Sequence, residues 1–315
     1  MISEVKIENG CVLEKGLPEG FIITDKNVFE KYGSLIKGDK FVIESGEKSK
    51  TLEVYGEILK KLGDVKRIVA FGGGVVGDLA GFIASTYKRG IDLVQVPTTL
   101  LSMTDSSIGG KTGINLGEKK NYVGTFYPAS EVLMDPLFLK DLSEREFRNG
   151  VAEIVKYGVV FGTPSLERLE RGVFLEDKDL SEIISQCVDC KTRIVKEDPL
   201  DNGIRKTLNF GHMAGHALEL VLGFRHGEAI SIGMLVEMKL GKIKNIFNDE
   251  QINIVKRILE KSGLSVELPE NLDIDKMIDL MKQDKKGALI FSFNTKNQEV
   301  IFNELEIREV LNNGN

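Results

Sequence analysis

The segment from residue 67 to residue 87 constrains the fold of this 315-residue chain more than any other. The apolar run IVAF predicts a buried strand, the glycine-rich FGGGVVGD follows it, and an apolar helix is predicted from Leu79 onward. Gly72, Gly74 and Gly77 match the GxGxxG spacing in this strand, turn and helix context. Glycines there let backbone N–H groups approach a pyrophosphate at a helix N-terminus. The segment therefore predicts a dinucleotide-binding turn in an α/β unit.

The rest of the N-terminal half alternates in the same way. Strands are predicted at 21–24, 41–43, 92–97 and 131–135, helices at 28–35 and 50–62, and a weak hairpin from VKIE and VLEK within residues 1–20. The acidic residue expected about 20 positions after the glycines is missing at the end of the next strand, because Asp92 opens that strand. An ordinary Rossmann arrangement is therefore in doubt, and Asp25 is the alternative carboxylate for the adenosine side.

From about residue 143 the strand patterns give way to long helical ones. Helices are predicted at 144–162, 166–171, 179–197, 208–221, 227–246, 250–261 and 274–283, and IFSFN and EVIFN can form a small terminal hairpin. The chain is also longer than a single core usually grows. We therefore predict a Rossmann-like α/β domain with a parallel sheet over 1–142 and an all-α domain over 143–315.

The three histidines of the chain, His212, His216 and His226, all lie between residues 208 and 230. The first two are four residues apart on a predicted helix, so both imidazoles should project from one face. Core histidines with satisfied hydrogen bonds are the alternative, but such a cluster favours a divalent metal site. No HExxH motif is present, since Met213 follows His212, so a metal-binding carboxylate must come from elsewhere. Glu153, within an apolar helical run, should be bound to metal or paired with Lys156.

A glycine-rich polar stretch at 102–125 cannot fill a core, so it is predicted to be an ordered functional loop. Its Lys111, Lys120 and Asn121 offer charge and hydrogen bonds to an anion. A solvated surface loop is the alternative.

Composition excludes several classes of function. A net charge of −6 without a basic stripe argues against nucleic acid. Three cysteines fit a reducing compartment better than a disulfide framework. Cys187 and Cys190 form a lone CxxC on a predicted helix, so a zinc site there is not expected. There is neither a signal-peptide pattern nor an apolar run of roughly 18 residues, so we expect a cytoplasmic protein without a membrane partner.

Five ordered motifs together resemble the 3-dehydroquinate synthase family. They are GGGVVGDLAGFIASTYKRG, VQVPTTLLSMTDSSIGGKTGIN, GVAEIVKYG, NFGHMAGHALE and HGEAISIGM, within a likeness from about Asp25 to Lys286. The resemblance implies an NAD-binding α/β domain, a helical domain that binds zinc or cobalt, and a homodimer. It also implies a lyase of the shikimate pathway, which converts 3-deoxy-D-arabino-heptulosonate 7-phosphate to 3-dehydroquinate and phosphate. The route is transient oxidation by NAD, phosphate elimination, reduction and an intramolecular aldol step.

The resemblance also implies roles for individual residues, by motif position. The implied metal ligands are Glu153, His212 and His226, and the implied catalytic residues are His216, Lys156, Asn121 and Asp105. The implied substrate contacts are Lys111, Lys191, Arg205, Asn209, Lys285, and Arg89 from the neighbouring subunit. The implied NAD contacts are Asp25, Glu47, Lys50, Gly73, Gly74, Asp78, Thr98, Thr99 and Lys120. In FLKDLSERE, Asp141 and Ser143 replace a threonine and a proline of the family pattern.

Two enzyme alternatives remain beside this one. A sister sugar-phosphate cyclase, of the 2-deoxy-scyllo-inosose or valiolone synthase type, would keep the metal motif and change the substrate contacts. A metal-dependent polyol or glycerol phosphate dehydrogenase would release NADH in each turnover. A binding module without catalysis is disfavoured, since a full ligand set plus His216 exceeds what binding needs.

Overall fold

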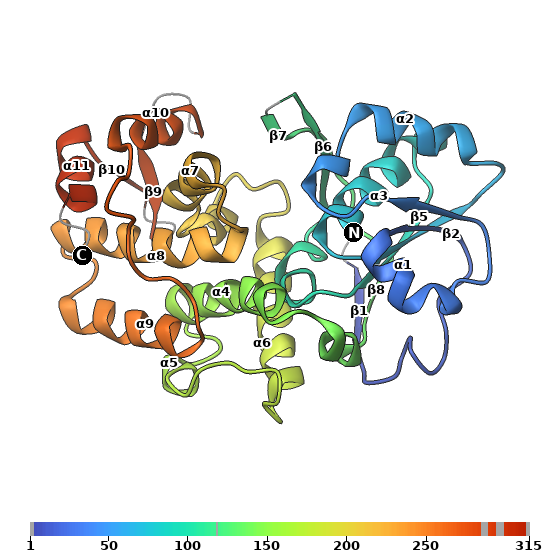
Figure 1. The fold of residues 1–315 in the computed structure, drawn as a ribbon, viewed down its shortest axis with the longest axis horizontal. Coiled ribbons are helices and arrows are strands. Elements are labelled where there is room, and N and C mark those ends of the chain that lie inside the picture. The colour runs from blue at the N-terminus through green and yellow to red at the C-terminus, as the bar shows by residue number, and fades with distance from the viewer. Residues whose placement is uncertain (1–2, 118, 285–288, 294–298, 313–315) are drawn as a thin grey trace. The chain divides into compact units, whose positions relative to one another are not determined.

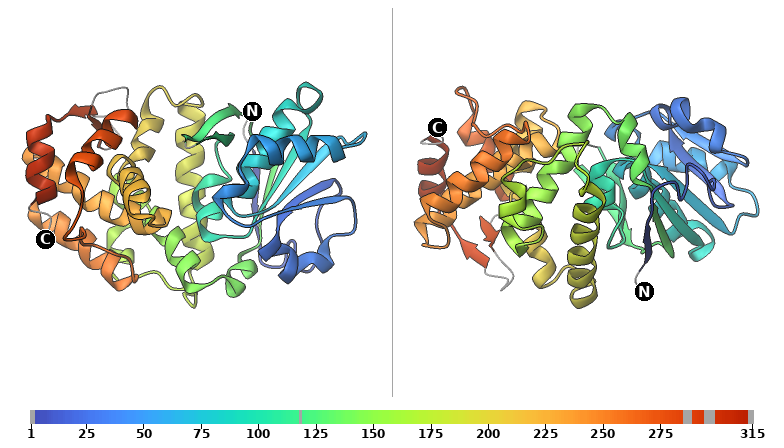
Figure 2. Two further views of the ribbon diagram at one scale, coloured as in Figure 1. Left: turned by 45° about the horizontal axis from the view of Figure 1, so that its top comes forward. Right: turned by 90° about the horizontal axis from the view of Figure 1, so that it is seen from below.

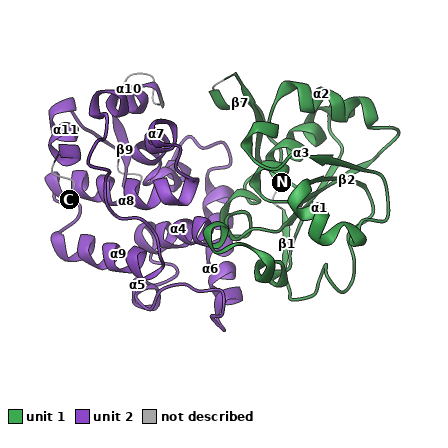
Figure 3. Cartoon of the chain, in the orientation of Figure 1, with its two compact units in different colours: residues 1–147 green, residues 148–315 purple. Residues whose placement is uncertain are grey.

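The computed structural model describes residues 3–117, 119–284, 289–293 and 299–312 (Figure 1). Contacts divide the chain into two compact units, residues 1–147 and 148–315 (Figure 3), which are described separately. The division falls inside helix α4 (Glu144–Phe161), whereas the sequence placed the boundary at 142/143.

Unit 1 is built on a sheet of six parallel strands (Figure 2). In spatial order they are β1 (Glu4–Ile7), β8 (Glu131–Met134), β5 (Asp92–Pro97), β4 (Arg67–Gly72), β2 (Phe21–Asp25) and β3 (Lys40–Ile43). The central strands β2, β4 and β5 are almost wholly buried, as expected for a parallel sheet covered on both faces. The predicted parallel sheet is confirmed.

The face of the sheet that each helix of unit 1 covers follows from the direction of the crossover that contains it. They are α1 (Lys26–Tyr32), α2 (Leu52–Lys61) and α3 (Gly74–Thr86), with short 3-10 turns η1 (Gly33–Leu35), η2 (Glu47–Ser49), η3 (Tyr87–Arg89) and η5 (Pro136–Asp141). The chain moves outward from β2 to β3 and then returns past β2 to β4 and β5. Because such crossovers are right-handed, α1 covers one face and α2 and α3 cover the other. The direction of the crossovers therefore reverses between β2 and β4. At such a point α/β proteins commonly bind ligands, at the carboxyl edge of the sheet.

The N-terminal hairpin expected within residues 1–20 is wrong. β1 instead pairs in parallel with β8, and VLEK lies in a turn. The buried Asp135 carboxylate accepts the backbone N–H groups of Gly10, Val12 and Leu13 at 2.9, 3.1 and 2.9 Å. A carboxylate far along the chain thus satisfies the donors that a hairpin would have paired, which sequence patterns cannot reveal.

The glycine-rich stretch after β5 is more regular than a loop. It contains the π-helical turn η4 (Ser102–Ser106) and an antiparallel hairpin of β6 (Lys111–Leu116) and β7 (Lys119–Phe126). A Cβ on Gly124 would lie 2.1 Å from the Thr112 carbonyl oxygen, and a Cβ on Gly81 of α3 would lie 2.4 Å from Thr112 Cγ2. Glycines are therefore needed here for close packing.

Unit 2 is mostly helical. It contains most of α4, then α5 (Leu166–Leu169), α6 (Leu180–Glu197), η6 (Ile204–Asn209), α7 (His212–Leu222), α8 (His226–Ile243), α9 (Asp249–Lys261), α10 (Ile274–Asp284), β9 (Ile290–Ser292), β10 (Glu299–Ile301) and α11 (Glu304–Asn312). The antiparallel pair β9 and β10 is the expected terminal hairpin, so this unit is not all-α. Helix α11 was not predicted, because its nine residues give too short a periodic run.

The core of unit 2 contains a cluster of phenylalanines beside the histidine helix. Phe210 lies 6.2 Å from Phe293 and 6.0 Å from Phe247, measured between ring centroids. Gly211 follows in the left-handed region at φ 80°, so α7 begins at His212 and not at residue 208 as predicted. Within the described residues, no helix has the length and hydropathy of a membrane span.

Candidate metal centre and cofactor-binding edge

The three histidines converge in unit 2. His212 and His216 lie one turn apart on α7, and His226 is the first residue of α8. One ring nitrogen of each lies within 4.8 Å of the others. The prediction that His212 and His216 share a face is confirmed.

Glu153 on α4 brings a carboxylate to the histidine cluster. Its Oε1 lies 3.0 Å from His226 Nε2 and 3.4 Å from His212 Nε2. Its Oε2 pairs with Lys156 Nζ one turn along α4, and both side chains are only 1% exposed. The two sequence interpretations of Glu153, structural pair and metal ligand, are therefore compatible, because each uses a different oxygen.

Hydrogen bonds on the far side of two rings fix how they are presented. His212 Nδ1 lies 3.1 Å from the Phe210 carbonyl oxygen, and His226 Nδ1 lies 2.8 Å from Glu219 Oε1. Each Nδ1 therefore donates, and in the neutral rings both Nε2 lone pairs face Glu153 Oε1. Two imidazole nitrogens and one carboxylate oxygen, held by outer hydrogen bonds, fit a zinc-type divalent ion.

The same surroundings shift the pKa values of His212 and His226 in opposite directions. Burial, with the positive charge of Lys156, lowers the pKa of His212 well below its usual value. Burial also acts to lower the pKa of His226, but hydrogen bonds to Glu153 and Glu219 outweigh it and raise the pKa to about 9. These shifts favour a protonated His226 and a neutral His212 in the ion-free protein at neutral pH.

Zinc binding should therefore release a proton. At pH 7.5 we expect the ion to displace about one proton from His226 Nε2 and none from His212, because only a deprotonated nitrogen can coordinate. The apparent affinity should rise with pH until about 9, where His226 is already neutral. Titration calorimetry in buffers of different ionisation enthalpy measures the released proton, and a heat that does not depend on the buffer would contradict the expectation.

A glycine brings His226 to Glu153. Gly227 lies against Asn149, one turn before Glu153 on α4, and a Cβ on Gly227 would lie 2.5 Å from the Asn149 carbonyl oxygen. The Gly227 N–H also donates to Asn149 Oδ1. Helices α8 and α4 thus meet backbone to backbone beside the cluster.

Gly227→Ala should therefore weaken zinc binding by about tenfold or more and destabilise the fold by about 1–3 kcal/mol, as overpacking does. Calorimetry with zinc and thermal unfolding would measure the two effects. Gly56→Ala in α2 is the matched control, since a Cβ there meets nothing within 4 Å, and it should be neutral or slightly stabilising. Zinc affinity unchanged in Gly227→Ala would show that this contact does not set the site.

Other predicted residues of unit 2 lie on α6 and η6. Lys191 on α6 and Arg205 in η6 are 6% and 2% exposed. Arg205 Nη1 donates to the Pro199 carbonyl oxygen at 2.8 Å, and Lys156 Nζ donates to that of Leu208 at 2.8 Å. Asn209 ends η6. Lys285 lies outside the described residues.

In unit 1 the predicted NAD contacts follow the carboxyl ends of strands. Asp25 is the last residue of β2, Glu47 and Lys50 follow β3, Gly73, Gly74 and Asp78 follow β4, and Thr98 and Thr99 follow β5. Asp25 caps α1, and Gly73 is the N-cap of α3. A Cβ on Gly74 would lie 3.0 Å from Ser106 Oγ. The buried Lys50 ammonium donates to Asp78 Oδ2 at 2.7 Å. One edge of the sheet therefore carries nearly all of these residues.

The remaining predicted residues of unit 1 lie beyond that edge. Half-buried Asp105 is in η4, while Lys111, Lys120 and Asn121 are exposed on the β6–β7 hairpin. Arg89 is exposed in η3 with a left-handed φ of 67°.

The family-pattern departures have local roles. Asp141 Oδ2 accepts the Tyr32 hydroxyl at 2.6 Å, and burial together with this carboxylate raises the pKa of Tyr32. Ser143 Oγ accepts the Glu146 N–H at 3.3 Å at the start of α4.

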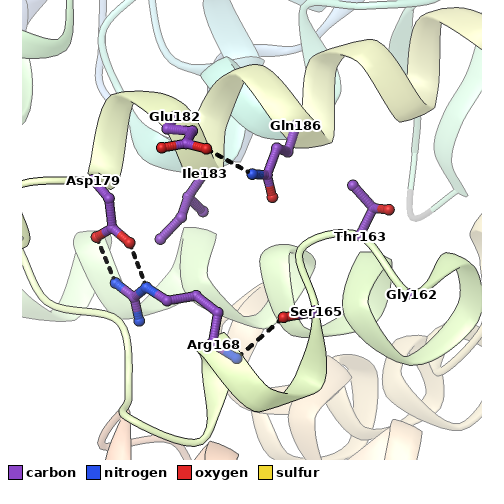
Figure 4. A pocket seen from close by; sticks show the side chains of 8 residues that line it. All are labelled: Gly162, Thr163, Ser165, Arg168, Asp179, Glu182, Ile183 and Gln186. Carbon is purple, nitrogen blue, oxygen red and sulfur yellow. Dashed lines mark hydrogen bonds and ion pairs between the residues drawn. The ribbon is translucent and has the colours of Figure 1, made fainter.

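A cavity of about 440 Å³ lies elsewhere in unit 2, beside α5 and the first turns of α6 (Figure 4). Within it, the Arg168 guanidinium is paired with Asp179 through two nitrogens and with Asp177 through one. None of the predicted site residues lines this cavity. Its Arg168 guanidinium is already bound by two carboxylates, so we interpret the group as a structural cluster.

Sequence reasoning missed Glu219 and Asn149. Glu219 had a readable signal, because it lies seven residues after His212 and so shares the face of the histidines. Asn149 had none, since its role depends on how α8 packs against α4.

Comparisons with known proteins identify the family. The 3-dehydroquinate synthase N-terminal family matches residues 40–149, and its C-terminal family matches residues 150–287. A 3-dehydroquinate synthase from Alkaliphilus metalliredigens is 38% identical over 291 residues, which cover 86% of this chain and 82% of that protein. One from Dictyoglomus turgidum is 40% identical over 282 residues, 85% of this chain and 79% of that protein.

Two solved structures share the two-domain fold. A 2-epi-5-epi-valiolone synthase from Streptomyces hygroscopicus, with NAD+ and Zn2+ bound, has a TM-score of 0.86 at 25% identity, covering 98% of this chain and 95% of that one. A 2-deoxy-scyllo-inosose synthase in complex with carbaglucose-6-phosphate, NAD+ and Co2+ has a TM-score of 0.82 at 26% identity, covering 93% and 89%. From the matched families, the similar relatives and the two-domain fold, this chain belongs to the 3-dehydroquinate synthase family.

Proposed function

We propose that this protein is a 3-dehydroquinate synthase, a lyase that converts 3-deoxy-D-arabino-heptulosonate 7-phosphate to 3-dehydroquinate and phosphate. The observation that carries the proposal is the convergence of Glu153 Oε1 with two oriented imidazole nitrogens, in a chain of this family. A binding protein has no need of such a constellation next to the further imidazole of His216.

Glu153, His212 and His226 would hold a zinc or cobalt ion. When bound, the ion supplies Lewis acidity toward a substrate oxygen. His216 then remains for proton transfer, and we propose that one of its ring nitrogens takes a proton from the substrate and returns it. Its ring lies 5.3 Å from that of His212, between centroids.

Buried cations of unit 2 would bind the anionic groups of the substrate. Lys191 and Arg205 are almost fully buried in a protein of net charge −6, which suits recognition of a carboxylate or a phosphate. Asn209 would hydrogen-bond substrate hydroxyls, and Lys156 would hold Glu153 in its ionised form.

The carboxyl edge of the sheet in unit 1 would bind NAD, which supplies a reversible hydride acceptor. Gly73 and Gly74 would let the backbone N–H groups at the start of α3 reach the pyrophosphate. Asp25, Glu47, Lys50, Asp78, Thr98, Thr99 and Lys120 are the further proposed NAD contacts. We assign Asp105, Lys111 and Asn121 to the substrate.

The test is phosphate release from 3-deoxy-D-arabino-heptulosonate 7-phosphate with catalytic amounts of NAD, with and without a chelator. We expect metal-dependent release without net NADH, because the cofactor is reoxidised in each turnover. NADH accumulating in proportion to product would indicate a dehydrogenase. No release from protein that binds both zinc and NAD would refute the proposal, and glucose 6-phosphate and sedoheptulose 7-phosphate would then be assayed.

The alternatives are less well supported. The solved sister cyclases are 25% and 26% identical to this chain, below the 37–40% of the 3-dehydroquinate synthases. An iron-containing alcohol dehydrogenase, at 15% identity and a TM-score of 0.63, shares the fold alone.

We further propose a homodimer in which Arg89 serves the substrate phosphate of the neighbouring subunit. An exposed arginine on strained backbone suits such a role. Two variants inactivated in different residues should recover activity on mixing if Arg89 acts across the dimer, and no recovery would exclude it.

A further inference from the structure

The β6–β7 hairpin contains a bulge next to the predicted NAD contacts. Ile114 pairs with Val123 and Leu116 pairs with Lys119. Asn115 alone therefore faces three residues of β7, and the Asn121 N–H among them is left without a backbone partner across the ladder. Bulges of this kind re-aim side chains near active sites.

Asn115 satisfies that orphaned donor. Its Oδ1 accepts the Asn121 N–H at 2.7 Å, and Asn121 adopts a left-handed φ of 51°. In this conformation Asn121 Oδ1 accepts a hydrogen bond from Lys50 Nζ. The position of the Asn121 side-chain amide thus depends on the hydrogen bond between the Asn121 backbone N–H and the Asn115 side-chain oxygen.

The other end of Asn115 reaches the sheet edge. Its Nδ2 donates to Glu47 Oε1 at 2.9 Å, and its backbone N–H donates to the Lys50 carbonyl oxygen at 2.7 Å. Lys50 Nζ lies 3.5 Å from the same Glu47 oxygen. Glu47, Asn115, Asn121 and Lys50 therefore form a closed ring of contacts, three between side chains and one from the Asn121 backbone N–H, in which each member is held by two others.

We propose that Asn115 is a positioning residue that links the NAD contacts Glu47 and Lys50 to Asn121, a residue assigned to the substrate. This inference rests on the proposed function. It assigns Asn115 no contact with substrate or cofactor. The residue acts by donating to Glu47 through one end of its amide and accepting from Asn121 through the other.

Asn115→Ala removes both contacts and should raise the Kd for NAD and lower kcat, each by about five- to tenfold. Asn115→Asp keeps the acceptor for Asn121 but places a carboxylate against Glu47, so it should mainly raise the Kd for NAD. Lys119→Ala on the same hairpin is the control, since its exposed side chain takes no part in the ring, and it should leave both quantities unchanged.

A double-mutant cycle separates positioning from general damage. Glu47→Gln with Asn115→Asp restores the hydrogen bond with donor and acceptor exchanged. Asn115→Asp should therefore raise the Kd for NAD severalfold in the wild-type background and less than twofold in the Glu47→Gln background. Calorimetry without substrate measures the Kd, and thermal unfolding checks that the variants fold.

Equal effects of Asn115→Asp in both backgrounds would overturn the inference, as would Asn115→Ala with NAD affinity and kcat within twofold of wild type. A wild-type protein that binds NAD but releases no phosphate would count against the proposed function alone, because the binding cycle still decides the role of Asn115. Failure of the wild type to bind NAD would refute both.

Discussion

His212→Ala and Glu153→Gln are each expected to lower zinc affinity by at least about 100-fold and phosphate release to below about 1% of wild type. Losing a direct ligand should cost at least as much as losing an outer hydrogen-bond partner, which costs 10- to 100-fold. Glu153→Gln replaces a charged ligand by an isosteric neutral one and keeps an oxygen for Lys156, so the fold should be retained. Zinc content after dialysis and calorimetry would measure the loss.

His216→Ala is the matched control, because all three histidines bring a ring nitrogen within the same 4.8 Å. If the ligands are Glu153, His212 and His226, this variant should bind zinc normally and still lose activity. Zinc loss in His216→Ala with retention in Glu153→Gln would instead indicate ligation by three histidines. Full zinc occupancy in His212→Ala would contradict the proposed ligand set outright.

Asp135→Ala is expected to destabilise the protein by about 3 kcal/mol or more, without a direct effect on the metal centre. Its carboxylate accepts three N–H groups of the N-terminal turn and a fourth from Leu137 at 3.2 Å. Each buried donor left without a partner costs ~1–3 kcal/mol, and water can reach only some of them. Denaturant unfolding of the metal-free protein would measure the change.

Asp64→Ala is the control for Asp135→Ala, since Asp64 pairs with Lys88 at 2.5 Å on the surface with an 89% exposed side chain. Exposed pairs contribute little, so no measurable change is expected. A stability loss for Asp135→Ala no larger than that of Asp64→Ala would show that the turn does not depend on its carboxylate.

Periodicity and glycine spacing predicted much of the architecture. The buried strands β2, β4 and β5 were readable because parallel strands covered on both faces are continuously apolar. Helix α3 was readable from its long apolar run, although it begins at Gly74, within the predicted glycine loop, and not at Leu79. These signals are local, so a short stretch of sequence is enough to read them.

The N-terminal turn and the hairpin bulge were not readable in this way. The turn is held by Asp135, more than a hundred residues away along the chain, and the backbone at Asn121 is held by the side chain of Asn115. In both cases the backbone conformation is decided by a side chain that only folding brings near.

The candidate metal centre shows the same division. Spacing alone placed His212 and His216 on one face of a helix, because a fixed turn of 3.6 residues requires it. Clustering in the sequence made His226 a further candidate, and the apolar run around Glu153 left that residue either a metal ligand or a partner of Lys156. The family motifs then indicated both as ligands. Only the tertiary structure brought them to 3.0 Å, through the glycine contact between α8 and α4. The tertiary structure also placed Glu219 of α7 within hydrogen-bond distance of His226 Nδ1 on α8. The sequence could not give these contacts, because the distance between two helices depends on how their side chains pack and not on the order of residues within either helix.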